Sequence, residues 1–208
     1  MKLVWEGVSV KEKNSGWGRT LIEFVVMLVV VIVAVQLLVK FVVSKDIVSG
    51  PSMQTTLENG DRLYSLRHKQ VKRDDIVVID APDDPGALYI KRVIGMPGDT
   101  IRFKNDVLYL NGKRTAEPYL DRAFAKKEIA SYATKEGMDP SSIKFTINFN
   151  IATWPSTKSK TVPKDSYFVM GDNRLISKDS RSFGFVKKNK VQSVVVWRYW
   201  PLNQMKIF

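Results

Sequence analysis

The chain has few of the side chains from which hydrolases build familiar active sites. It contains no cysteine and a single histidine, His68, whose charged neighbours in LRHKQ are typical of a surface position. These counts exclude thiolate nucleophiles, thiolate metal sites and an HExxH metalloprotease. The residues left to carry chemistry are Ser52, Lys91 and a charged cluster around Ser177.

Ser52 lies in the segment SGPSMQTTLENGD. Gly50 and Pro51, immediately before it, favour an abrupt bend that would expose a hydroxyl group and a backbone N–H. Such a bend suits a nucleophile, but an ordinary Gly-Pro-Ser turn on the surface has the same composition. The segment alone therefore leaves both interpretations open.

Lys91 lies in LYIKRVI (88–94), a run with the apolar, β-branched composition of a strand. Successive side chains of a strand point to opposite faces, so either Lys91 or Arg92 must face the more buried side. Burial would lower the pKa of a lysine and convert it into a base. An edge strand would instead leave both charges in solvent.

A third segment, GDNRLISKDSRSFG (171–184), is rich in opposite charges. It brings four charged residues and one serine close together in sequence: Asp172, Arg174, Ser177, Asp179 and Arg181. Such a pattern suits an ordered active-site loop, and it equally suits a charge-paired loop without a catalytic role.

The elements that must position these residues begin with an apolar segment, 21–43. Its central part, 24–39, has no charge and only one polar residue, Gln36. Twenty-three helical residues would span roughly 34 Å, enough for a ~30 Å hydrocarbon core. No small-x-small cleavage pattern follows in SKDIVSGPSM, so we expect an uncleaved anchor, not a removed signal peptide or a buried helix.

Charge favours one orientation of this anchor. Four Lys or Arg residues precede it, so the positive-inside rule predicts a short cytoplasmic N-terminus (1–20), a transmembrane signal anchor (21–43) and an extracytoplasmic domain (44–208). The first 43 residues carry +2 of the total net charge of +12, which leaves +10 on the domain. A basic surface of this kind either faces an anionic partner or is simply solvated.

Strands and turns dominate the sequence after the anchor. Four apolar, β-branched runs predict strands, and two turn signals predict hairpins: 75–80, 87–95, 166–172 and 191–200, with turns at 105–106 and 111–112. The polar region 117–163 contains the only credible helical stretch, 117–138, and we interpret it as an insertion. The sequence therefore predicts a mainly β fold with one N-terminal helix.

Three segments in order, SGPSMQTTL, YIKRVIGMPGD and GDNRLISKDSRSFGFV, together with the anchor, resemble the membrane-bound type I signal peptidases, especially the Gram-positive branch. The resemblance extends over the anchor and nearly all of 44–200, apart from 117–163. It implies a signal-peptidase-like antiparallel β-sheet or barrel with a small insertion. It also implies a serine endopeptidase that removes signal peptides from secreted preproteins after small-x-small sites. The implied partners are signal peptides and the lipid bilayer, with no metal, cofactor or nucleic acid.

The resemblance assigns the chemistry to two residues. Ser52 would be the nucleophile that forms an acyl-enzyme, and Lys91 would be the general base. A free lysine has a pKa of about 10.4 and a useful base one of about 7–8, so burial would have to supply the difference. The Ser52 backbone N–H would stabilise the oxyanion. Gly50 stands where some members have a serine hydroxyl, which leaves the second donor open.

Supporting roles follow from the same motifs. Ser177 would orient the Lys91 ammonium group, and Asp179 would support Ser177 and Arg181. Asp172 would pair with Arg181 and fix the loop. The resemblance also predicts the apolar lining of the pockets for small residues: Val48, Met53, Leu57, Tyr89 and Ile90.

Other functions remain open. A non-catalytic, signal-peptidase-like assembly chaperone would share the fold, but loss of Ser52 or Lys91 would mark it, and both are present. A self-cleaving Ser–Lys protease fits the long anchor poorly, and a basic module that binds wall polymers is supported by charge alone. The sequence does not specify client preproteins or oligomeric state.

Overall fold

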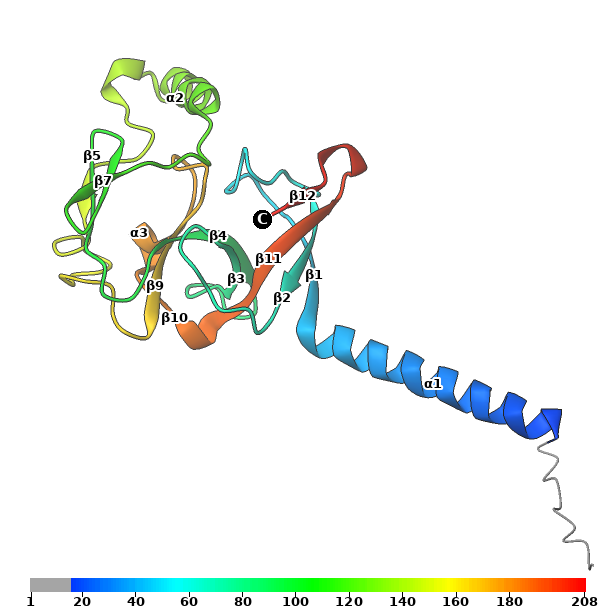
Figure 1. Cartoon of the computed structure of the whole chain (residues 1–208). Coiled ribbons are helices and arrows are strands. Elements are labelled where there is room, and N and C mark those ends of the chain that lie inside the picture. Colours follow the sequence, from blue (N-terminus) through cyan, green and yellow to red (C-terminus); the bar gives the residue numbers. More distant parts are fainter. Residues whose placement is uncertain (1–15) are drawn as a thin grey trace, which may run out of the picture. The chain divides into compact units, whose positions relative to one another are not determined.

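The computed structural model describes residues 16–208, and the chain divides into two units, Met1–Phe41 and Val42–Phe208. Helix α1 (Trp17–Val42) has 26 residues, about 39 Å of helix, and a window of mean hydropathy 3.0. It is long and apolar enough to cross a membrane, and it begins four residues before the expected start (Figure 1). Most of the predicted cytoplasmic segment 1–20 lies outside the described residues.

The larger sheet of the second unit has eight antiparallel strands in the order β1–β2–β11–β3–β4–β9–β10, with β12 paired to β11. Their bounds are Val43–Ile47 (β1), Arg62–Leu66 (β2), Ile76–Asp80 (β3), Leu88–Gly95 (β4), Ser166–Met170 (β9), Val186–Lys187 (β10), Val191–Trp200 (β11) and Lys206–Ile207 (β12). The strand β4, which carries Lys91, lies between β3 and β9. It pairs with β3 over Leu88–Arg92 and with β9 only over Arg92–Gly95.

The smaller sheet has four antiparallel strands in the order β7–β6–β5–β8. They are Lys113–Thr115 (β7), Val107–Leu110 (β6), Ile101–Lys104 (β5) and Phe149–Asn150 (β8). The helices of this unit are α2 (Arg122–Glu136), α3 (Ser180–Phe183) and three 3₁₀ turns, Pro140–Ser142 (η1), Lys188–Lys190 (η2) and Leu202–Gln204 (η3). Asp121 caps the start of α2, and Gly137 ends it in the left-handed region at φ 66°.

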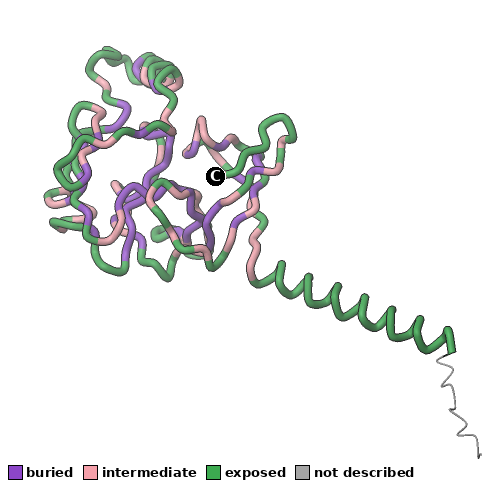
Figure 2. The backbone as a smooth tube through the Cα atoms, viewed as in Figure 1, coloured by how far each residue is buried: buried purple, intermediate pink, exposed green. Residues whose placement is uncertain are grey.

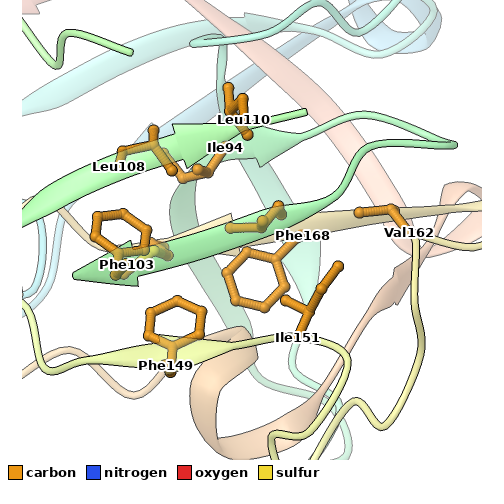
Figure 3. Packing of buried hydrophobic residues seen from close by; sticks show 10 residues of the cluster. Ile94, Phe103, Leu108, Leu110, Phe149, Ile151, Val162 and Phe168 are labelled. Atoms are coloured by element: carbon orange, nitrogen blue, oxygen red, sulfur yellow. The ribbon is translucent and has the colours of Figure 1, made fainter. Parts of the chain in front are cut away.

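Alternating side chains of the strands build the core. In β5 the side chains of Ile101 and Phe103 are buried while their neighbours are exposed, as a two-residue period requires. Phe103 stacks on Phe149 with ring centroids 5.0 Å apart, and Phe168 of β9 joins them (Figure 3). These contacts join the smaller sheet to the larger one, and buried residues follow the strands of the unit (Figure 2).

The prediction of a mainly β fold with one N-terminal apolar helix is confirmed. Strands occur in each of the four predicted runs, and the two turns separate β5, β6 and β7 as expected. The helix predicted over 117–138 is shorter in the structure, Arg122–Glu136, because Asp121 is its N-cap and Gly137 its C-cap. The prediction missed the strands β1 and β2 and also β8, which lies inside the region 117–163 and pairs with β5.

Candidate active site

Ser52 and Lys91 lie in direct contact. The Lys91 Nζ atom donates a hydrogen bond to Ser52 Oγ at 2.9 Å and another to the Ile90 carbonyl at 3.1 Å. Lys91 projects from β4, whereas Ser52 lies in the loop between β1 and β2. A serine hydroxyl at this distance from a lysine nitrogen has the geometry of a nucleophile and its base.

The Ser52 loop is fixed by apolar anchors on both sides of the serine. Val48 and Met53 are buried in the same core cluster, and Leu57 follows one turn later with its N–H donating to the Met53 carbonyl at 3.0 Å. The N–H of Gly60 returns to the Val48 carbonyl at 2.9 Å and closes the loop. These buried apolar residues and backbone hydrogen bonds position Ser52, although it lies in neither a helix nor a strand.

Lys91 is buried despite its charge, with only 4% of its surface exposed. Burial lowers the pKa of Lys91 to about 8, although the carboxylates of Asp179 and Asp172 oppose this shift. At neutral pH roughly one Lys91 side chain in ten is then the free amine. A lysine in this state can accept a proton from a serine hydroxyl.

Gly171, at the start of the 171–184 segment, permits the close packing around Ser52. A Cβ atom at this position would overlap the Ser177 hydroxyl and the Ser52 carbonyl oxygen, so only glycine fits. Two residues later, the Asn173 N–H donates to the Ser52 carbonyl at 3.1 Å. The segment therefore holds the backbone of Ser52 through this hydrogen bond and through the close approach at Gly171.

Asp179 and Arg181 form the expected ion pair. Their closest approach is 2.7 Å between Asp179 Oδ2 and Arg181 Nη2, and Asp179 also accepts a bond from the Gly171 N–H at 3.1 Å. Ser177 differs from the prediction. Its Oγ atom is buried and has no hydrogen-bond partner among the described residues, so the expected bonds to Lys91 and Asp179 are not formed.

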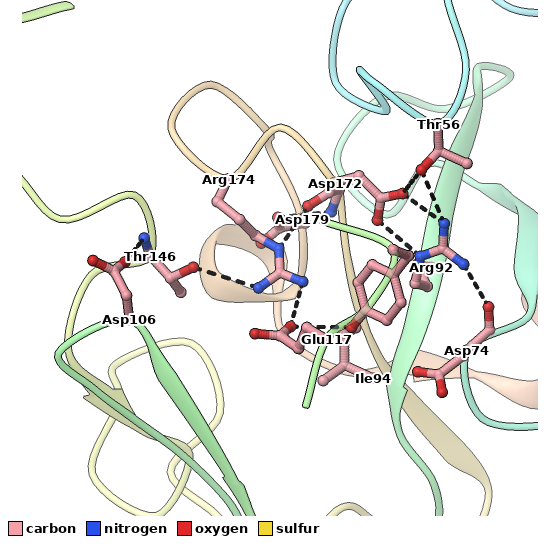
Figure 4. Close-up of polar contacts among 12 residues, drawn as sticks. Thr56, Asp74, Arg92, Ile94, Asp106, Glu117, Thr146, Asp172, Arg174 and Asp179 are labelled. Atoms are coloured by element: carbon pink, nitrogen blue, oxygen red, sulfur yellow. Dashed lines mark hydrogen bonds and ion pairs between the residues drawn. The ribbon is translucent and has the colours of Figure 1, made fainter. Parts of the chain in front are cut away.

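The predicted pair of Asp172 and Arg181 is wrong. Asp172 instead pairs with Arg92, with Arg92 Nη2 2.6 Å from Asp172 Oδ2 and both side chains buried (Figure 4). The reason is strand pairing: Arg92 lies opposite Met170 on β9, so the residues just beyond Met170 meet the arginine. The Thr56 hydroxyl also donates to Asp172 at 2.5 Å, which links the Ser52 loop to the pair.

Lys91 and Arg92 are consequently both buried, although the sequence led us to expect only one buried cation. The Arg92 guanidinium donates hydrogen bonds to Asp172 and, through Nη1, to the Asp74 carbonyl at 2.8 Å. Lys91 has no such carboxylate hydrogen bond in the described part of the chain. Burial without a carboxylate hydrogen bond therefore lowers the pKa of Lys91.

A second buried ion pair, Arg174 with Glu117, was not predicted. Arg174 Nη2 lies 2.6 Å from Glu117 Oε1, and its Nη1 lies 3.4 Å from the Thr146 hydroxyl (Figure 4). The pair ties the 171–184 segment to the region after β7. Nothing in the local sequence distinguishes Glu117 from a surface carboxylate.

A pocket of about 310 Å³ opens beside Ser52. Its lining comes from two extended segments and one residue of β3: Lys45, Asp46, Ile47, Val48, Ser49, Ser52, Met53, Val78, Leu88, Tyr89, Ile90 and Lys91. Four of the five predicted apolar lining residues are there. Leu57 is not, because it is buried in the core cluster with Leu63 and Ile76. The prediction missed three apolar lining residues, Ile47, Val78 and Leu88.

No group of three or more His, Asp or Glu side chains within residues 16–208 is arranged to hold a metal ion. The charged group in contact with Ser52 is the Lys91 amine, and Lys45 and Asp46 line the same pocket. The site therefore offers a hydroxyl, an amine of lowered pKa and a pocket lined by both polar and apolar residues.

Comparisons with known proteins give consistent matches. The profile of the family described as "Signal peptidase, peptidase S26" matches residues 21–200. "Signal peptidase IB" of Staphylococcus aureus is 34% identical over 194 residues, which is 90% of this chain and 94% of that protein. "Signal peptidase I" of Bacillus licheniformis is 35% identical over 94% of this chain and 97% of that protein. A crystal structure of a signal peptidase I from Enterococcus faecalis is 39% identical, with a TM-score of 0.49 over 61% of this chain and 97% of the other.

Proposed function

The chain belongs to the signal peptidase family, peptidase S26, and we propose that it removes signal peptides from secreted preproteins by means of Ser52 and Lys91. The observation that carries the proposal is the 2.9 Å contact between Ser52 Oγ and the Nζ atom of a buried lysine. Burial supplies the base that a serine hydrolase otherwise obtains from histidine. The single histidine of the chain, His68, is exposed.

In the first step the free amine of Lys91 takes the proton of the Ser52 hydroxyl while Oγ attacks the scissile carbonyl carbon. The carbonyl π electrons move to its oxygen and form a tetrahedral oxyanion. The C–N bond then breaks, and Lys91 passes its proton to the departing amine, which is the N-terminus of the mature protein. Ser52 is left as an ester of the signal peptide.

In the second step water attacks this ester. Lys91 accepts a proton from the water, and collapse of the second tetrahedral intermediate returns that proton to Ser52 Oγ. The signal peptide leaves with a new carboxyl group, and the dyad is restored. Lys91 thus acts as base and then as acid in both halves of the reaction.

The oxyanion needs donors that are not already engaged. The Ser52 N–H makes no hydrogen bond with any described residue, and the Asn173 N–H fixes the other side of Ser52 by holding its carbonyl. The Gly50 N–H is not available, because it donates to Asn59 Oδ1 at 3.0 Å. We therefore assign the Ser52 N–H as one donor and exclude Gly50 as the second in this conformation.

The pocket beside Ser52 suits an extended peptide with small side chains. It lies between residues 45–53 and 88–91, so a substrate can run alongside either segment as an additional strand. Met53, with 1% of its surface exposed, closes the floor next to the nucleophile. A large side chain at the residue before the cut would collide with this floor, which supports cleavage after small-x-small sequences.

We further propose that α1 anchors the enzyme in the cell membrane, with residues 1–20 in the cytoplasm and 44–208, including 117–163, as the extracytoplasmic catalytic domain. The length and hydropathy of α1 support the anchor. The bilayer and signal peptides would be its partners. An anchor also raises the local concentration of substrates whose own apolar helices lie in the same membrane.

Formation of an acyl-enzyme can be tested by adding hydroxylamine during cleavage of a preprotein by the full-length protein in detergent. An ester on Ser52 partitions between water and hydroxylamine, so we expect a signal peptide with a C-terminal hydroxamate in its mass spectrum. Cleavage that yields only the free carboxylate at all hydroxylamine concentrations would contradict a covalent intermediate.

A further inference from the structure

A second pocket, of about 450 Å³, lies on the larger sheet and shares no lining residue with the pocket at Ser52. Its walls come from the loop between β2 and β3, the turn at 96–97, the strands β9 and β11, and the 3₁₀ turn that precedes β11. The proposed peptidase reaction gives it no role.

The rim of this pocket is basic. Arg67, Lys69, Lys188 and the exposed His68 contribute to the lining, and no aspartate or glutamate does. Lys69 lies 3.4 Å from the Asp75 carboxylate and is partly neutralised. Arg67 and Lys188 form no salt bridge with any residue that the structure describes. Two cations without a salt bridge to a described residue therefore line the pocket.

The lining of the pocket also includes apolar residues and one unsatisfied polar group. Met96, Pro97 and Val71 line it together with Ser193 of β11. The Ser193 hydroxyl is buried and lacks a hydrogen-bond partner among residues 16–208. A buried hydroxyl without a partner costs free energy, and a ligand or water in the pocket would relieve that cost.

The pocket lies next to the point at which the chain leaves α1. The Arg67 N–H donates to the carbonyl of Val42, the last residue of α1, at 2.9 Å, and Val43 pairs with Leu66 across β1 and β2. If α1 spans the bilayer, its last residue lies at the level of the lipid headgroups. Arg67 is then held at that level by a backbone hydrogen bond.

We propose that this pocket binds the phosphate of an anionic lipid headgroup, with Arg67 and Lys188 contacting the phosphate and the unsatisfied Ser193 hydroxyl forming a hydrogen bond with the headgroup. Guanidinium and ammonium groups at a membrane surface attract anionic headgroups, and the site also has an apolar wall that free solvent anions do not need. The inference rests on the membrane anchoring proposed above. Inorganic phosphate presents the same anionic oxygens to Arg67 and Lys188, so the test must distinguish a lipid phosphate from free phosphate as the ligand.

The test uses the full-length protein in a nonionic detergent and counts bound ligands by native mass spectrometry. The probes are a short-chain phosphatidylglycerol, a short-chain phosphatidylcholine and inorganic phosphate. The variant Arg67→Gln/Lys188→Gln removes both cations of the rim. The matched control, Lys126→Gln/Lys127→Gln, removes the same charge from exposed positions on α2. This helix lies far from β10, the strand that directly precedes Lys188 (Figure 1).

We expect one tightly bound phosphatidylglycerol, no comparable phosphatidylcholine, and at least tenfold weaker binding in the rim variant alone. Displacement by inorganic phosphate at equal concentration would support the phosphate site and overturn the lipid as its source. Equal binding of both lipids, or equal loss in the control variant, would overturn the site. Cleavage of a detergent-solubilised preprotein, measured in parallel, should be unchanged in the rim variant. A protein that cleaves but binds no lipid refutes the pocket, and one that binds but does not cleave refutes the peptidase proposal.

Discussion

The Nζ atom of Lys91 lies 2.9 Å from the Oγ atom of Ser52, although 39 positions of sequence separate the two residues. The contact brings a buried base with a pKa of about 8 to a serine whose backbone is held by the Asn173 N–H. The lowered pKa of Lys91 depends on its burial, whereas the position of Ser52 depends on the 171–184 segment. The two contributions can therefore be tested separately.

The rate of cleavage should follow the ionisation of Lys91. Because only the free amine accepts the Ser52 proton, kcat/KM should rise nearly tenfold per pH unit below about 8 and level off above it. A pH–rate profile on a signal-peptide substrate measures this directly. A profile that is flat between pH 6 and 9 would show that Lys91 does not titrate in the rate-determining step.

Replacement of Lys91 by methionine should abolish cleavage and stabilise the fold. In the wild type, burial of the ammonium below pH 8 costs on the order of 3 kcal/mol, as judged from a pKa lowered from 10.5 to about 8. After allowance for the lost hydrogen bonds, we expect a gain of about 1–3 kcal/mol at pH 7. Chemical denaturation of the full-length protein in detergent measures it.

The sign of the pH dependence provides a check. Between pH 8 and 10.5 the unfolded chain binds more protons at this lysine than the folded chain does, so wild-type stability rises there with pH. The advantage of Lys91→Met should therefore shrink as the pH rises through this window. The exposed control Lys126→Met should show neither the gain nor the trend. A destabilised Lys91→Met would contradict the burial cost.

The buried pair of Asp172 and Arg92 should be far more important for stability than an exposed pair. Asp172→Ala leaves the buried Arg92 guanidinium without its carboxylate, which typically costs about 3–5 kcal/mol. Asp83→Ala breaks an ion pair with Lys178, whose side chain is 61% exposed, and should cost less than about 1 kcal/mol. Equal losses in denaturant titrations would show that the Asp172 pair is not buried as described.

Much of this site could be predicted from the sequence, and the parts that could not share one cause. Short-range patterns identify β3, β4, β9 and β11, since alternation and turn residues act locally. The partner of Asp172 does not follow from such patterns, because Arg92 lies 80 positions away and is brought near by strand pairing. Leu57 was misplaced for a similar reason. Leu57 is buried in a cluster with Leu63 and Ile76, which the fold brings against it and which a motif match does not reveal.

The α2 helix should influence catalysis through a single hydrogen bond. Glu128 accepts from the Asn173 side chain at 3.2 Å, and the Asn173 N–H holds the Ser52 carbonyl. Glu128→Ala should therefore lower kcat by roughly fivefold, about 1 kcal/mol, with little change in KM. Glu136→Ala on the same helix is the control and should have no effect. A change in KM alone would assign α2 to substrate binding and not to positioning of Ser52.

Substrate selection should depend on the residue immediately before the cut. With Met53 closing the pocket floor, a preprotein with phenylalanine there should be cleaved roughly 100-fold more slowly than one with alanine, in kcat/KM. Matched peptides that differ only at this residue measure the ratio. Similar rates for both would mean that the pocket beside Ser52 does not hold that side chain.

The most direct test of the account is cleavage of a lipid-embedded preprotein by the purified full-length protein, with Ser52→Ala beside the wild type. Ser131→Ala, on the exposed surface of α2, controls for the loss of a hydroxyl. We predict cleavage after a small-x-small site by the wild type and the control, and none by Ser52→Ala. Undiminished cleavage by Ser52→Ala, or none by a folded wild type across several preproteins, would contradict the Ser52–Lys91 peptidase.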